Sequence, residues 1–354
     1  MNIAFFGSSL LSAYWNGAAT YYRGIISALH ERGHRITFYE PDAFGRQEHR
    51  DLSPPQWAEV IVYEASEEAA LRQVERASRA DLVIKASGVG VFDELLDAAV
   101  LQARRPGGAV AFWDVDAPAT LDRVQLDPGD PFLPLIPQYD LIFTYGGGLP
   151  VESAYLELGA RKCAAIYNGL DAATHHPVPP EPRFRADLAF LGNRLPDREE
   201  RVVDFLFGAA RRLPEKHFLL AGSGWERKGL PANITPLGHL YTCDHNALNC
   251  SARVVLNISR ASMARYGFSP ATRVFEAAGA GACLISDAWN GIECFFEPDH
   301  EILVANDGDE VAELLFALTP QEARKIGKAA YERARCEHTY AARALEVEAV
   351  LDVA

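Results

Sequence analysis

The stretch Tyr266-Gly-Phe-Ser-Pro-Ala-Thr-Arg-Val-Phe-Glu276 and its continuation Ala277-Ala-Gly-Ala-Gly-Ala-Cys-Leu-Ile-Ser-Asp287 decide the fold of this chain. Their pattern predicts a loop, a helix, a tight glycine turn and a buried strand, in that order. This succession is typical of a parallel β-sheet covered by helices. The stretch therefore predicts an α/β fold.

The start of the predicted helix is a candidate anion site. Because Pro270 suits the first turn of a helix, we expect the N–H groups of Ala271, Thr272 and Arg273 to point outward, where they can bind a diphosphate. The Arg273 guanidinium would add charge-assisted hydrogen bonds. Glu276 lies one turn further on, where its carboxylate can accept two hydroxyl hydrogens from a ribose. The alternative is a first-turn glutamate favoured by the helix dipole.

The same alternation extends outward in both directions. Short apolar runs, each a predicted buried parallel strand, occupy residues 2–6, 35–39, 81–85, 109–113, 140–144, 187–191, 217–221, 254–258 and 283–286. Helical stretches separate these runs, the first over 19–31, and an alanine-rich helical stretch covers 321–354. The chain thus predicts repeated strand and helix units along its whole length.

A proline-rich segment divides this pattern into two halves. The four prolines between 177 and 182 form a stiff stretch that neither a helix nor a central strand tolerates. A length of 354 residues also fits two domains better than one. We therefore expect a first Rossmann-like domain over 1–172, a linker over 173–186, a second Rossmann-like domain over 187–335, and a C-terminal helix over 336–354 that crosses back onto the first domain.

Composition narrows the class of protein. The net charge of −14 and the pI near 5.2 argue against a nucleic-acid partner, which normally needs a basic face. No apolar run approaches the roughly 20 residues that span a bilayer, and the N-terminus resembles a first strand rather than a leader. The six cysteines form no paired framework. We expect a cytoplasmic protein with reduced thiols and no transmembrane segment.

The glycine motifs of other nucleotide-binding enzymes are missing. No Gly-x-Gly-x-x-Gly follows the first strand, where the sequence is Gly7-Ser-Ser-Leu-Leu11, and no Walker-type lysine loop occurs. This weakens dehydrogenase and ATPase interpretations. Gly222-Ser-Gly-Trp225 follows a predicted strand, and both a plain turn and a base-binding loop fit it.

The order of loop, Arg-x-x-Glu-Ala-x-Ala/Gly-x-Gly, apolar strand and Trp289-Asn-Gly-Ile-Glu293 resembles the donor-site motif of GT-B glycosyltransferases. Within these enzymes the chain is similar to the CgeB-like group, which is related to the family 4 (group 1) glycosyltransferases. Further matches cover nearly the whole chain and lie at 81–88, 113–118, 167–171, 190–194 and 245–249.

The resemblance implies a GT-B fold, in which two Rossmann-like doubly wound domains face a cleft. It also implies a hexosyltransferase-like enzyme that binds a nucleotide sugar in its second domain and an unidentified acceptor in its first. Such enzymes need no cofactor and no obligatory metal. We therefore predict no metal site.

The resemblance also assigns individual residues to the donor. Arg194 and Arg198 match basic positions placed against the donor phosphates, although a solvated charge pair is an equal alternative. Gly17 precedes the first helix in a loop that approaches the phosphates in such enzymes; an ordinary turn is its alternative. The residues assigned to the donor nucleotide and its phosphates are Gly17, Asn193, Arg194, Arg198, Gly222, Ser223, His239, Leu240, His245, Thr272, Arg273 and Glu276.

One position departs from the family pattern. Many retaining members carry a second glutamate eight positions before the ribose-binding one, where it contacts the transferred sugar, and this chain has Phe268 there. Retention and inversion therefore both stay open. Ser262, Tyr266 and Ser269 are the candidates for the sugar contacts.

Asp114 and Asp116 are candidate general bases. They follow a predicted strand of the first domain, and ligands of parallel sheets bind at the carboxyl ends of strands. A carboxylate within hydrogen-bond reach of an acceptor hydroxyl can remove its proton. A helix cap before Pro118 is an equal alternative for each, and Asp116 is the preferred base.

Two groups of histidines have structural alternatives. His239, Cys243, His245 and Cys250 cluster in the sequence, but their spacing fits no standard zinc pattern. His245 is expected to line or cap the nucleotide loop. His175-His176 beside the prolines is interpreted as a hinge, with an acceptor role as the minor alternative.

Two other functions fit the same architecture. A sugar-nucleotide epimerase or hydrolase would bind the same donor, but the acid and base groups it needs are not identifiable. A non-catalytic sugar-nucleotide-binding protein is compatible with Phe268.

Overall fold

The computed structural model describes residues 1–14, 16–225 and 229–352, and the chain divides into two compact units. Unit 1 comprises Met1–Tyr167 and Tyr340–Ala354, and unit 2 comprises Asn168–Thr339. The changes between units lie near the boundaries predicted at 172/173 and 335/336. Within the described residues, every strand pairing in both units is parallel.

Unit 1 contains a seven-stranded sheet in the order β3-β2-β1-β4-β5-β6-β7. Its strands are β1 (Asn2–Phe6), β2 (Arg35–Asp42), β3 (Glu59–Glu64), β4 (Leu82–Ala86), β5 (Ala109–Asp114), β6 (Leu141–Thr144) and β7 (Cys163–Ala165). Its helices are α1 (Ala19–Glu31), α2 (Glu67–Ala77), α3 (Asp93–Ala99), α4 (Ala117–Leu126), α5 (Gly148–Glu157) and α13 (Tyr340–Asp352).

Unit 2 contains a six-stranded sheet in the order β10-β9-β8-β11-β12-β13. Its strands are β8 (Leu188–Leu191), β9 (Phe218–Ala221), β10 (Ile234–Gly238), β11 (Val255–Asn257), β12 (Leu284–Asp287) and β13 (Leu303–Ala305). Its helices are α6 (Pro196–Val202), α7 (Gly208–Arg212), α8 (Thr242–Ser251), α9 (Ala261–Tyr266), α10 (Thr272–Gly279), α11 (Gly308–Ala317) and α12 (Pro320–Glu337).

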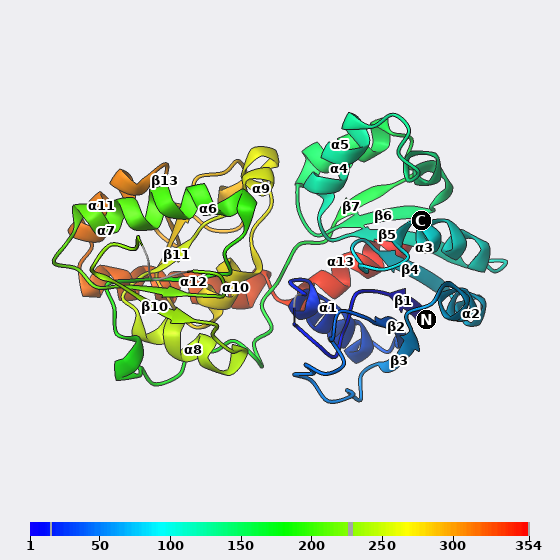
Figure 1. Cartoon of the computed structure of the whole chain (residues 1–354), viewed down its shortest axis with the longest axis horizontal. Helices are drawn as coiled ribbons and strands as arrows, with labels where there is room; N and C mark the ends of the chain where they lie inside the picture. The colour runs from blue at the N-terminus through cyan, green and yellow to red at the C-terminus, as the bar shows by residue number, and fades with distance from the viewer. Residues whose placement is uncertain (15, 226–228, 353–354) are drawn as a thin grey trace. The chain divides into compact units, whose positions relative to one another are not determined.

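The central strands are buried on both faces because successive side chains point to opposite sides of a sheet. On β8, Leu188 and Phe190 pack into one apolar cluster, whereas Ala189 and Leu191 pack into another. Figure 1 shows α6 and α8 on opposite sides of this sheet. This arrangement explains why the central strands have continuous apolar sequences, and the predicted pair of Rossmann-like parallel sheets is confirmed.

The last part of the chain differs from its prediction. The helical stretch expected over 321–354 is two helices, α12 and α13, because the backbone leaves helical geometry at His338. Thr339 then pairs with Leu170 in a short parallel bridge. Helix α13 packs against α1, where the ring of Tyr340 lies directly on Gly24, so any larger residue at 24 would clash with it. None of the described helices is long and apolar enough to cross a membrane.

Candidate functional site

The strand order of unit 2 points to one edge of its sheet. The order reverses between β8 and β11, and ligands of doubly wound sheets bind outside the carboxyl ends of the strands at such a reversal. The segment after β8 carries Arg194 and Arg198. The segment after β11 runs through Arg260 to α10, which carries Arg273 and Glu276. Arginines therefore come from both sides of the reversal, and one carboxylate, Glu276, comes from the segment after β11.

Helix α10 begins two residues later than predicted. Pro270 precedes the helix and Ala271 is its N-cap residue, so Pro270 does not lie in the first turn as predicted. The Ala271 carbonyl accepts a hydrogen bond from the N–H of Val274 at 2.9 Å. The Thr272 hydroxyl donates to Asn168 Oδ1 at 2.9 Å. Its side chain therefore anchors the helix start within unit 2.

Glu276 is the fifth residue of α10 and is only 7% exposed. It does not lie in the first turn, so the helix-dipole alternative does not account for it. Burial alone raises the pKa of Glu276, but the neighbouring His175, His245 and Arg273 together pull it below its ordinary value. The carboxylate is thus held charged in a buried position, which is the form that accepts hydrogen bonds from hydroxyl groups.

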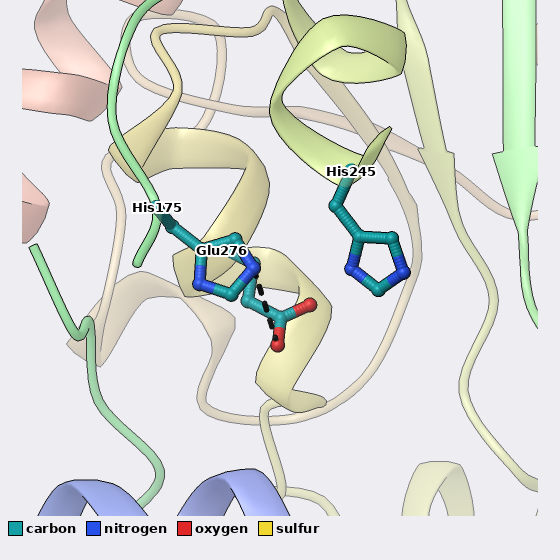
Figure 2. A group of neighbouring side chains, drawn as sticks. All are labelled: His175, His245 and Glu276. Carbon is teal, nitrogen blue, oxygen red and sulfur yellow. Dashed lines mark ion pairs between the residues drawn. The ribbon is translucent and has the colours of Figure 1, made fainter. Parts of the chain in front are cut away.

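His175 and His245 flank this carboxylate. His175 Nε2 lies 3.8 Å from Glu276 Oε1, and the imidazole is 2% exposed. Figure 2 shows the carboxylate between the two rings, with His175 on the segment before β8 and His245 on α8. Burial lowers the pKa of His245. The sequence interpretation of His175 as a hinge missed this contact, because about one hundred residues separate it from Glu276 along the chain.

Arg198 and Arg273 are the basic groups of the site. Burial lowers the pKa of Arg198 to about 10, and the positive charge of Arg273 adds to this effect. Burial also lowers the pKa of Arg273. Among the described residues, the buried Nε of each guanidinium has no hydrogen-bond partner. Two like charges that are half-buried and incompletely bonded favour an anion between them.

Arg194 and Arg260 have carboxylate partners. Arg194 Nη2 donates to Glu199 Oε1 at 2.7 Å, and Arg260 Nε donates to Asp197 Oδ2 at 2.5 Å. Arg194 is exposed. A phosphate contact from Arg194 therefore requires that this surface ion pair exchange, which costs little at an exposed site.

The loops after β8 and β9 are joined by a close backbone approach. Gly222 has φ +129°, and an added Cβ would lie 2.1 Å from the Gly192 carbonyl oxygen, so only glycine fits there. The Ser223 N–H donates to Asn193 Oδ1 at 2.9 Å, and Ser223 Oγ lies 3.5 Å from His239 Nδ1. The structure thus brings three residues predicted for the nucleotide, Asn193, Gly222 and Ser223, onto one loop pair, and a fourth, His239, lies beside them.

The segment after β10 lies beside these loops. The ring of His239 meets that of Tyr241 edge to face, with centroids 4.6 Å apart, and Tyr241 is 69% exposed. His245 Nε2 lies 3.4 Å from the Leu240 carbonyl oxygen. Leu240 therefore contributes its backbone, while its side chain packs against an apolar cluster of unit 2.

The residues predicted for sugar contacts have different surroundings. Ser262 Oγ on α9 is buried without a partner among the described residues. Ser269 is 3% exposed and donates to the Gly267 carbonyl at 2.8 Å. The Arg265 guanidinium lies 5.6 Å from the Tyr266 ring centre. Phe268 packs its ring on Gly291 and has φ +45°, so its side chain is used in packing.

In unit 1, Asp114 and Asp116 have distinct environments. Asp114 is fully buried and accepts hydrogen bonds from Tyr155 at 2.5 Å, from Ser87 at 2.7 Å and from the Asp116 N–H at 3.0 Å. These bonds give Asp114 a structural role. Asp116 occupies the N-cap position of α4, but its side chain makes no capping hydrogen bond. The capping alternative thus does not explain the Asp116 carboxylate.

Asn16 lies just before α1, where it accepts from Ser8 Oγ at 2.9 Å and donates to the Ser9 carbonyl at 2.7 Å. Gly17 follows it in an exposed position, and an added Cβ would meet nothing within 4 Å. A larger side chain would therefore fit at position 17.

The four residues considered for zinc in the sequence do not form a cluster in the described part of the chain. Cys250 Sγ instead accepts from the Val178 N–H and donates to the Ala280 carbonyl, both at 3.3 Å. His245 belongs to the group with His175 and Glu276.

Comparisons with known proteins agree with this architecture. Residues 198–349, which include Arg198, Arg273 and Glu276, match a family model described as glycosyl transferase-like. Sucrose-phosphate synthase from Thermosynechococcus elongatus has a TM-score of 0.72 and 14% identity, with 100% of this chain and 98% of that chain covered.

Anabaena HepE, solved in complex with UDP-glucose, has a TM-score of 0.71 and 15% identity, with both chains covered completely. Trehalose-6-phosphate synthase OtsA has a TM-score of 0.70 and 11% identity, with 99% of each chain covered. The fold is GT-B. A search of curated proteins finds no match.

The chain therefore combines a GT-B fold with a match to a glycosyl transferase-like family model over residues 198–349. The resemblance to the CgeB-like group stays a prediction.

Proposed function

We propose that this protein is a glycosyltransferase that moves a sugar from a nucleoside diphosphate sugar to an acceptor hydroxyl without using a metal. The observation that carries this proposal is a buried carboxylate, Glu276, on the same helix as Arg273, whose charge acts on a second half-buried arginine, Arg198. A sugar nucleotide presents a ribose diol next to a diphosphate, and this arrangement of charges is complementary to both.

In this proposal the diphosphate binds between Arg198 and Arg273 and completes their hydrogen bonding. Arg194 joins them after leaving Glu199. The Glu276 carboxylate accepts from the two ribose hydroxyls. The base lies against the loops of Gly222 and Ser223 and the segment of His239, where an exposed tyrosine offers a ring for stacking.

The ligands bound to a structurally similar protein support the donor class. HepE was solved with UDP, with UDP and glucose, and with UDP-glucose. This chain has the fold of that protein at 15% identity. Its own half-buried arginines and buried carboxylate provide the complementary groups.

For the transfer step we assign the general base to Asp116 in unit 1. The acceptor oxygen attacks the anomeric carbon of the donor, its proton passes to the Asp116 carboxylate, and the bond between the sugar and the diphosphate breaks. The nucleoside diphosphate leaves with that electron pair. Asp114 holds the strand end through its three hydrogen bonds and takes no proton.

The test is a panel of UDP-, GDP- and dTDP-sugars in buffer that contains EDTA. Thermal shift reports binding, and the released nucleoside diphosphate and the sugar product report turnover with and without a set of acceptor alcohols. We expect one donor class to stabilise the protein and to turn over when an acceptor is present. Stabilisation without turnover would instead indicate a binding protein, and donor breakdown without acceptor dependence would indicate a hydrolase or epimerase. If no nucleotide stabilises the protein, the proposal is wrong.

A further inference from the structure

Three potential metal ligands meet inside unit 2. One ligand atom each from His175, His245 and Glu276 lies within 4.8 Å of the other two (Figure 2). The three side chains come from separate segments: the stretch before β8, helix α8 and helix α10. Folding of unit 2 therefore assembles this group, which no local sequence pattern reveals.

The two imidazoles have unused nitrogen atoms. Both ring nitrogens of His175 are buried without a hydrogen-bond partner in the described part of the protein, and so is Nδ1 of His245. Most buried polar side-chain atoms in native proteins have a partner, so three unbonded nitrogens around one carboxylate require an explanation. The Glu276 carboxylate faces them, with 3.8 Å between its Oε1 and His175 Nε2. This distance is too long for a hydrogen bond.

The segment that carries His175 is held firmly in place. Asn246 on α8 donates to the Thr174 carbonyl at 2.8 Å and accepts from the His176 N–H at 3.3 Å. Asn246 directly follows His245, so these bonds fix the two histidines relative to each other. A ligand pair with a fixed separation binds a metal ion without a large loss of conformational freedom.

The ligand set selects the kind of ion. Two neutral imidazoles and one carboxylate suit Zn²⁺, Co²⁺ and their neighbours, whereas Mg²⁺ and Ca²⁺ prefer oxygen ligands. A point equally distant from three atoms 4.8 Å apart lies about 2.8 Å from each of them. Each ligand therefore has to approach by at most about 0.7 Å to reach a normal Zn–N or Zn–O bond of about 2.1 Å. Small side-chain rotations supply such a movement.

The charges around the group set the rest of the coordination. Arg273 acts on both Glu276 and His245, and its positive charge opposes a cation. Three protein ligands leave a fourth tetrahedral position open for water. Because Zn²⁺ strongly lowers the pKa of bound water, this position can carry a hydroxide whose negative charge offsets Arg273.

We propose that His175, His245 and Glu276 form a site for one Zn²⁺-class ion. An ion there engages the Glu276 carboxylate, so it excludes the ribose that the proposed function assigns to the same side chain. Only this second statement rests on the proposed function. Metal and donor would then compete, and the metal would inhibit transfer rather than take part in it.

The test uses the full chain, treated with EDTA, desalted and free of nucleotide. Zn²⁺ is titrated by calorimetry, and Co²⁺ by visible absorption, whose intensity is high for four-coordinate ions. We expect one ion per chain. We expect His175→Gln and His245→Gln each to weaken binding about 100-fold or more, since loss of even a supporting outer-shell group weakens a metal site 10- to 100-fold. His176→Gln is the matched control, because its exposed ring lies beside His175 in sequence and outside the cluster.

A further variant gives a positive signal. In His175→Cys the new thiolate can bind the ion, so a cysteine-to-cobalt charge-transfer band should appear in the near ultraviolet that the wild type lacks. Circular dichroism melts check that each variant folds. The same band in the wild type would place the ion on a native cysteine and overturn the proposal. Unchanged affinity in both glutamine variants, or no cobalt spectrum at all, would also overturn it.

The two proposals fail in different ways. Nucleotide binding is measured in EDTA, and metal binding is measured without nucleotide. A protein that binds nucleotides but no metal contradicts only the metal site. A protein that binds Zn²⁺ through both histidines but no nucleotide contradicts only the transferase proposal.

Discussion

Replacing Glu276 by glutamine tests the centre of the proposed donor site. The carboxylate can accept one hydrogen bond from each hydroxyl of a ribose diol, whereas the carboxamide offers a single acceptor oxygen. The variant therefore loses one hydrogen bond to a charged group in a position that is 7% exposed. Such a bond contributes about 1.5–3 kcal/mol, which corresponds to a rise in Kd of about 10- to 150-fold. The side chain keeps its shape, so little repacking is expected.

The measurement is calorimetric titration in EDTA with the best nucleoside diphosphate from the panel and, separately, with pyrophosphate. Pyrophosphate lacks the ribose, so its Kd should stay within about twofold or fall slightly as a negative charge disappears beside Arg273. Glu293→Gln is the control, since Glu293 is an exposed glutamate of the same unit. An unchanged Kd for the nucleotide would refute the ribose role. An equal loss for pyrophosphate would show that Glu276 acts by holding Arg273 in place.

Three further predictions follow from the geometry. Arg198→Gln should raise the Kd for the nucleoside diphosphate by about tenfold and change that for the nucleoside little, because the lost bonds go to phosphate; calorimetry showing equal losses for both would contradict this. Asp116→Asn should lower turnover by about 10²- to 10⁴-fold with donor affinity unchanged, and normal turnover of this variant would contradict the base assignment. Asp114→Asn should mainly lower the melting temperature, because it weakens the buried hydrogen bond from Tyr155. Because burial lowers the pKa of His245 in the folded state, the free energy of unfolding should fall as the pH drops below about 6.5. Urea titrations at several pH values should show a smaller fall for His245→Gln than for the wild type. Equal pH dependence of the two proteins would mean that another group is responsible.

The central strands could be predicted from the sequence, whereas the edge strands could not. The nine predicted strands all occur, and each is an apolar run buried on both faces of its sheet. The strands that the prediction missed are β3, β7, β10 and β13, which lie at the four edges of the two sheets. An edge strand is partly exposed, as β3 and β7 are, and so it needs no continuous apolar run. Continuous apolar runs therefore predict the central strands of a parallel sheet and not its edge strands.

The candidate site divides in the same manner. Arg273 and Glu276 could be predicted because they share one short helix, where their spacing is fixed by helical geometry. The place of His175 could not, since its contact with Glu276 depends on how the segment before β8 folds against α8 and α10. Asp114 and Asp116 looked alike in the sequence, and only the structure shows that Asp114 is fully buried and bonded by Tyr155 and Ser87. Sequence spacing thus predicts which side chains lie together on one helix. Long-range packing decides which of those side chains make structural hydrogen bonds and which can bind a ligand.

The half-buried arginines Arg198 and Arg273 explain why this edge of the sheet is suited to binding. Desolvation lowers the pKa of both Arg198 and Arg273, and the positive charge of Arg273 lowers that of Arg198 further. That arrangement destabilises the free protein relative to one with apolar side chains at the same places. The same low-dielectric surroundings favour binding of a diphosphate, because the attraction between opposite charges strengthens as the effective dielectric constant falls. Glu276 alone cannot supply this attraction, since its single charge is shared among Arg273 and two histidines. The free protein is therefore short of negative charge at the point where a sugar nucleotide carries two phosphates.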